Sequence, residues 1–111
     1  MAWKVDDAAA HPALRDAKIW LREVSFHLGV LAPRIRIRLF RRPGDIDIHF
    51  EQSHFLKPPN SSAPLMPPNK TDTQEGYVLF HAVQALTQAY ESALAAGHAP
   101  EDSWLVPNAN Y

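Results

Sequence analysis

The sequence predicts a single small α+β domain with two layers, in which a helix, a β-hairpin and a second helix follow one another as αββα. Residues 34–51 alternate charged and apolar side chains in the manner of a half-buried hairpin, and residues 75–97 repeat apolar side chains at helical spacing. A length of 111 residues fits one domain. We assign residues 1–111 to that domain and place a proline-rich loop at residues 53–74.

The first predicted element is a helix over residues 12–29. Pro12 suits a first helical turn, where its missing N–H is not needed, and Gly29 suits a helix end. Ile19 and Phe26 would point to one side of this helix, opposite its main apolar stripe, so we expect a second packing face there. That face would be covered by the chain's own tails or by a second subunit. The main stripe comprises Leu14, Ala17, Leu21, Val24 and Leu28.

The hairpin is predicted from the stretch RIRIRLFRRPGDIDIHFE, residues 34–51. Arginines alternate with apolar residues in its first half, and acidic residues and histidine alternate with apolar residues in its second half. Proline followed by glycine fits a type I or II turn, so we place the four residues RRPG in the loop. Arg38 then faces Asp47 on a charged face. Leu39 faces Ile46 on an apolar face, and a two-residue shift would preserve both faces.

Residues 53–74 hold five of the ten prolines and show neither a helical nor a strand period. A loop of this length in a small domain is commonly functional or disordered. The last helix is expected to begin after Thr71 or Thr73, since Thr71 and Gln74 have the spacing of a capping box, and to stop at Gly97.

The predicted hairpin leaves two open strand edges, which proteins usually cover or pair. One solution is a terminal strand from AWKV or SWLV, near either end of the chain. The other is pairing with a second copy about a two-fold axis, for which Ile19 and Phe26 would supply apolar side chains. We therefore predict a homodimer.

Composition excludes several classes of protein. The chain has 11 basic and 12 acidic residues, so it lacks the overall basic charge of a dedicated nucleic-acid binder. It contains no cysteine, which excludes disulfides, thiolate catalysis and cysteine metal sites. No run approaches the roughly 20 apolar residues of a membrane span, and the first residues do not resemble a signal peptide. We expect a cytoplasmic protein that does not contact a membrane.

One cluster has the residue types of a metal site. Asp47, His49 and Glu51 alternate along a predicted strand and would share one face. The arginines of the neighbouring strand would occupy the same face and repel a cation. Metal binding is therefore only a minor alternative, and we expect no cofactor.

The arginine row could instead bind phosphate, because a two-stranded ribbon can enter the major groove and arginine suits phosphate geometry. Acidic residues on the same face would cancel much of this charge. Nucleic-acid binding is the alternative function, and its residues would be Arg36, Arg38, Arg41 and Arg42.

Catalysis has little support, because the sequence has no P-loop, no dinucleotide glycine motif and no nucleophile elbow. The preferred hypothesis is a small non-enzymatic protein-interaction module of bacterial or mobile-element type. It would bind a protein partner through the proline-rich loop and exposed aromatic side chains. The loop residues expected to contact the partner are Phe55, Leu65, Met66, Pro67 and Pro68.

Overall fold

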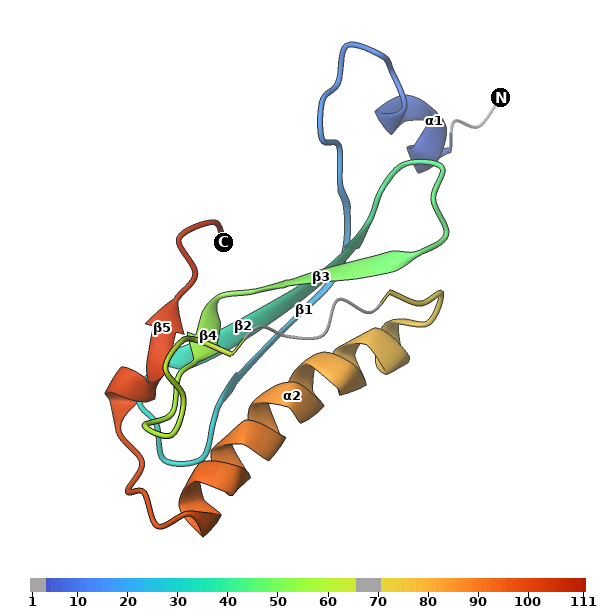
Figure 1. Cartoon of the computed structure of the whole chain (residues 1–111). Helices are drawn as coiled ribbons and strands as arrows, with labels where there is room; N and C mark the ends of the chain where they lie inside the picture. Colours follow the sequence, from blue (N-terminus) through green and yellow to red (C-terminus); the bar gives the residue numbers. More distant parts are fainter. Residues whose placement is uncertain (1–3, 66–70) are drawn as a thin grey trace.

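The structure is a computed structural model that describes residues 4–65 and 71–111. A three-stranded antiparallel sheet in the order β1-β2-β3 lies beside the long helix α2, and β4 and β5 form a second, two-stranded sheet (Figure 1). The elements in chain order are α1 (Val5–Ala9), β1 (Ile19–His27), β2 (Arg34–Arg41), β3 (Ile48–Gln52), β4 (His54–Leu56), α2 (Glu75–Ala95), the 3₁₀ helix η1 (Asp102–Trp104) and β5 (Leu105–Pro107).

The fold is α+β, but the predicted αββα arrangement is wrong, because residues 19–27 form strand β1 rather than part of a helix. β1 pairs antiparallel with β2, and the register shifts between Trp20 and Arg22, which makes Leu21 the extra residue of a β-bulge. The bulge places two core-facing residues of one strand, Leu21 and Val24, three positions apart. That spacing imitates a helix, although the branched and aromatic side chains of this segment favour a strand.

The predicted hairpin is present as β2 and β3, with a register four residues away from the expected one. Arg38 faces Glu51 instead of Asp47. The loop therefore extends over residues 42–47, and Ile46, expected on the apolar face, is 74% exposed. An even shift keeps every side chain on its face. It also gives Arg38 two hydrogen bonds to Oε2 of Glu51, at 3.0 and 2.8 Å.

The described parts of the proline-rich segment are joined to the body by strand pairing and hydrogen bonds. Its first residues form β4, whose partner β5 comes from the SWLV segment. A strand from this terminal segment therefore exists, but it forms a separate two-stranded sheet with β4 and does not extend the sheet of the hairpin. In the other candidate segment, AWKV, Val5 begins α1. Leu65 donates its backbone N–H to Leu56 at 2.8 Å, and Ile48 donates its N–H to Asp72, also at 2.8 Å. Strands β4 and β3, from the two sheets, therefore hold the chain on the two sides of residues 66–70.

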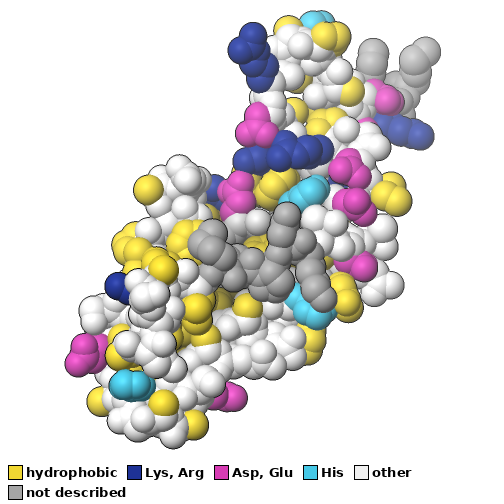
Figure 2. Space-filling view, in the orientation of Figure 1, with side chains coloured by type: hydrophobic (Ala, Val, Ile, Leu, Met, Phe, Trp, Pro, Cys, Tyr) yellow, Lys and Arg dark blue, Asp and Glu magenta, His cyan; other side chains and the backbone are white. Residues whose placement is uncertain are grey.

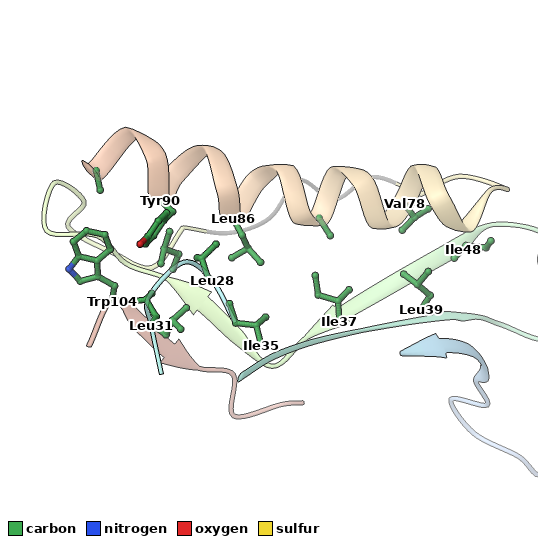
Figure 3. Close-up of a cluster of buried hydrophobic side chains, with 14 residues drawn as sticks. Leu28, Leu31, Ile35, Ile37, Leu39, Ile48, Val78, Leu86, Tyr90 and Trp104 are labelled. Carbon is green, nitrogen blue, oxygen red and sulfur yellow. The ribbon is translucent and has the colours of Figure 1, made fainter. Parts of the chain in front are cut away.

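The hydrophobic core lies between the sheet and α2, and the predicted last helix is confirmed. Side chains of α2 point toward those of β2 (Figure 3). α2 packs over β2, β3 and β4, which leaves the apolar side chains of β1 at the margin of the core. The fully buried residues that carry this packing include Ile35, Ile37, Leu39, Leu56, Val78 and Ala82.

Candidate functional site

The sheet face opposite α2 carries a cluster of aromatic and charged side chains centred on Arg38. The Arg38 guanidinium lies 4.5 Å from the ring centre of Trp20 and 3.9 Å from that of Tyr111. Burial raises the pKa of Glu51, but hydrogen bonds from Lys18 and Arg38 outweigh this and hold that pKa below its ordinary value. The charged side chains of the cluster thus pair with one another, and Trp20, at its margin, remains 49% exposed.

Tyr111 also belongs to this cluster. Tyr111 donates a hydrogen bond from its hydroxyl to Oε1 of Glu23 at 2.8 Å. Burial and this hydrogen bond raise the pKa of Tyr111 to about 12. Sequence reasoning did not find this contact, because the two residues are 88 positions apart.

Two aspartates that precede β1, Asp6 and Asp16, bind the two arginines at the hairpin turn. Arg41 forms two hydrogen bonds with the carboxylate of Asp6, at 2.5 and 2.6 Å, and Arg42 contacts Asp16 at 2.6 Å. Hydrogen bonds from Arg41 lower the pKa of Asp6 to about 2. On the face shown in Figure 2, most of the charged side chains lie toward the end of the molecule that carries the hairpin turn.

The four arginines proposed for nucleic acid are therefore not equivalent. Arg38, Arg41 and Arg42 each pair with a carboxylate of the same chain. Arg36 is exposed, and its side chain makes no hydrogen bond or ion pair within residues 4–65 and 71–111. Internal pairing removes much of the positive charge that phosphate binding requires.

The three candidate metal ligands do not lie on one element, and one of them is already engaged in ion pairs. Asp47 lies in the hairpin loop, while His49 and Glu51 lie on β3. Lys18 and Arg38 already bind the Glu51 carboxylate. Among the described residues, no three potential ligands are grouped so that they could hold a metal ion.

The predicted partner-binding residues divide into three groups. Phe55 lies in β4 opposite Val106 and is half-buried. Leu65 is exposed and fixed by its backbone hydrogen bond to β4. The predictions for Met66, Pro67 and Pro68 lie outside the described residues.

Three aromatic side chains form a cluster on the first turns of α2, in which Tyr77 and Phe80 are exposed and His81 is half-buried. Tyr77 is 45% exposed and Phe80 is 56% exposed. The ring of His81 meets both edge-on, with ring centres 4.4 Å from Tyr77 and 5.5 Å from Phe80. We call these three residues the α2 aromatic cluster. Sequence reasoning did not single it out, but its signal is visible, since these aromatics lie outside the apolar stripe that faces the core.

The predicted second packing face also has a different location. Ile19 and Phe26 lie at opposite ends of strand β1, where both are half-buried, and Phe26 packs against the core cluster. They therefore belong to an edge strand of the sheet and not to the second side of a helix.

Comparison of the chain with protein-family models, curated proteins and solved structures finds no match. The helices of the described residues include none with the length and apolar character needed to cross a bilayer.

Proposed function

We propose that this protein is a small non-enzymatic interaction module that binds a protein partner through the α2 aromatic cluster and the proline-rich loop. The observation that carries the proposal is the exposure of Tyr77 and Phe80 on a helix whose opposite face is fixed in the core. Aromatic side chains are enriched among the residues that dominate protein–protein binding energy. A helix held rigidly also loses little conformational entropy when a partner binds.

The loop supports the same function because its chain is fixed at two points, one on each side of residues 66–70. Leu65 is tied to β4 and Asp72 is tied to β3 by backbone hydrogen bonds. A segment anchored at both ends pays less ordering entropy on binding than a free tail would. Leu65 adds an exposed apolar side chain at one of these anchors. A cytoplasmic location belongs to this proposal.

The proposal is tested with the double variant Tyr77→Ala/Phe80→Ala in pull-downs from native lysate. Each side chain is expected to contribute about 2 kcal/mol to binding. Either truncation alone should therefore raise the dissociation constant of the partner complex about 30-fold. Helix content measured by circular dichroism should remain unchanged, because both side chains face solvent. The matched control is Gln88→Ala/Glu91→Ala, which truncates two other exposed side chains of α2.

The pull-down is run at low and high salt, with and without nuclease. A protein partner that survives both treatments, is lost in the aromatic variant and is kept by the control would support the proposal. Equal capture by the wild type and the aromatic variant would contradict it. Capture that disappears with nuclease or high salt would favour the second candidate, nucleic-acid binding at the exposed Arg36 and Trp20.

A further inference from the structure

Strand β1 has one unpaired edge. The sheet order β1-β2-β3 places β2 on one side of β1, and no other strand of the described residues pairs with its second side. The bulge at Leu21 interrupts the first half of this edge, and bulges hinder pairing with another strand. The second half, residues 23–27, pairs regularly with β2 and offers five consecutive residues in extended conformation.

The core is also incomplete at this edge. α2 packs over β2, β3 and β4, so Val24 and Phe26 are only half-buried on the helix-facing side of β1. Glu23, Ser25 and His27 are exposed on the other side. An additional strand at this edge would cover apolar side chains on one face and meet polar ones on the other.

The sequence of residues 23–27 matches itself in one register. Two copies of a strand pair antiparallel about a two-fold axis normal to the sheet, and directly opposed residues share a face. With Ser25 on the axis, Glu23 faces His27 twice, and apolar Val24 faces apolar Phe26 twice.

Neighbouring registers match less well. An axis at Glu23 brings two carboxylates together, which is destabilising. An axis at Val24 places Arg22 opposite Phe26, and an axis at Phe26 places Glu23 opposite Gly29. Registers between these would exchange the faces and oppose apolar with polar side chains.

We propose that a second copy of this chain pairs antiparallel with residues 23–27 of β1, with Ser25 on the two-fold axis, to form a continuous six-stranded sheet. The occupant of the edge is the identical strand because its polar and apolar residues are self-complementary, with Glu23 opposite His27 and Val24 opposite Phe26. The interface is separate from the α2 aromatic cluster, so the inference goes beyond the proposed function.

Single cysteine variants test the register, since the chain has no cysteine of its own. In Ser25→Cys the two new residues face each other across the axis with Cα atoms about 4.5–5.5 Å apart. Disulfides span Cα separations of about 4.4–6.8 Å. In the matched variant His27→Cys the symmetry mates are four positions apart along the strands, about 13 Å, which a disulfide cannot span.

Under mild oxidation, Ser25→Cys is expected to run as a covalent dimer on a non-reducing gel, and His27→Cys as a monomer. Equal cross-linking of the two variants, or none in Ser25→Cys, would overturn the register. A wild-type protein that sediments as a monomer at high micromolar concentration would overturn the dimer itself.

Charge variants test the same contact without cysteine. His27→Glu opposes two carboxylates twice and is expected to raise the dimer dissociation constant at least about tenfold. The double variant Glu23→Gln/His27→Glu removes the repulsion and should recover most of the affinity. His98→Glu, which makes the same change beyond the end of α2, should dimerise like the wild type. Unchanged dimerisation of His27→Glu would overturn the proposal.

The two proposals fail separately. Tyr77→Ala/Phe80→Ala is expected to dimerise normally while losing the partner. A monomeric wild type that still captured a partner through those aromatics would refute only the dimer.

Discussion

Replacing Gly29 with alanine should destabilise the fold through a contact far away in the sequence. Gly29 has φ +55°, a left-handed conformation that disfavours residues with a Cβ atom. A Cβ built at this position overlaps Oη and Cζ of Tyr90 and lies 2.8 Å from its Cε1. Tyr90 is buried in the core, with its ring edge-on to Trp104 at 6.1 Å, so it cannot turn away without disturbing its neighbours.

Two costs contribute to the expected loss of stability. The left-handed conformation costs alanine about 1–2 kcal/mol. Overpacking of a filled core costs about 1–3 kcal/mol more. Gly29→Ala should therefore lower the free energy of unfolding by about 2–5 kcal/mol, a large part of the roughly 5–15 kcal/mol of a typical domain.

Urea denaturation followed by circular dichroism measures this change, and Gly44→Ala separates its two parts. Gly44 also has positive φ, at +78°, but a Cβ there meets nothing within 4 Å. Gly44→Ala should therefore show only the conformational cost, about 1–2 kcal/mol. In a Tyr90→Ala background, Gly29→Ala should cost no more than Gly44→Ala, because the obstructing ring is gone. Equal losses for the two glycine variants in the wild-type background would refute the close contact with Tyr90.

Asp6→Asn should remove an acid-sensitive part of the stability. The folded pKa of Asp6, about 2, lies below its ordinary value of 3.8, so the contact with Arg41 stabilises the fold above that value and is lost as the pH falls toward 2. Thermal melts should show wild type and variant converging over this interval, and a constant difference would contradict the prediction. Ile37→Ala should cost about 2–5 kcal/mol in urea denaturation, because Ile37 is fully buried between sheet and helix. Its control, Ile46→Ala, should change stability by less than about 0.5 kcal/mol, and a larger loss would favour the register with Ile46 inside.

Local patterns in the sequence were sufficient for two elements. The alternation over residues 34–51 identified the hairpin and its two faces, and the apolar spacing after residue 74 identified α2. Both patterns recur over consecutive residues of one segment, so they can be recognised without knowing which distant residues the segment contacts. The hairpin register was wrong because an even shift leaves the pattern of faces unchanged.

Residues 19–27 show where local reasoning fails. One bulged residue changes an alternating strand pattern into spacings of three, and only pairing with β2 decides that the segment is extended. Of the two candidate surfaces, one could be recognised from the sequence and the other could not. Aromatic residues at positions 77, 80 and 81 could be recognised outside the apolar stripe of α2, whereas the open edge of β1 could not.

The sequence by itself determined the α+β class, the alternating charge of the hairpin and the long C-terminal helix. The tertiary structure alone decided which arginines are neutralised, since Arg41 meets Asp6 across 35 positions and Arg42 meets Asp16 across 26. It also decided that β1 is a strand with one open edge. Periodicity reports which face of an element is apolar, but ion pairs and strand pairing depend on distances between residues that only the folded chain brings together.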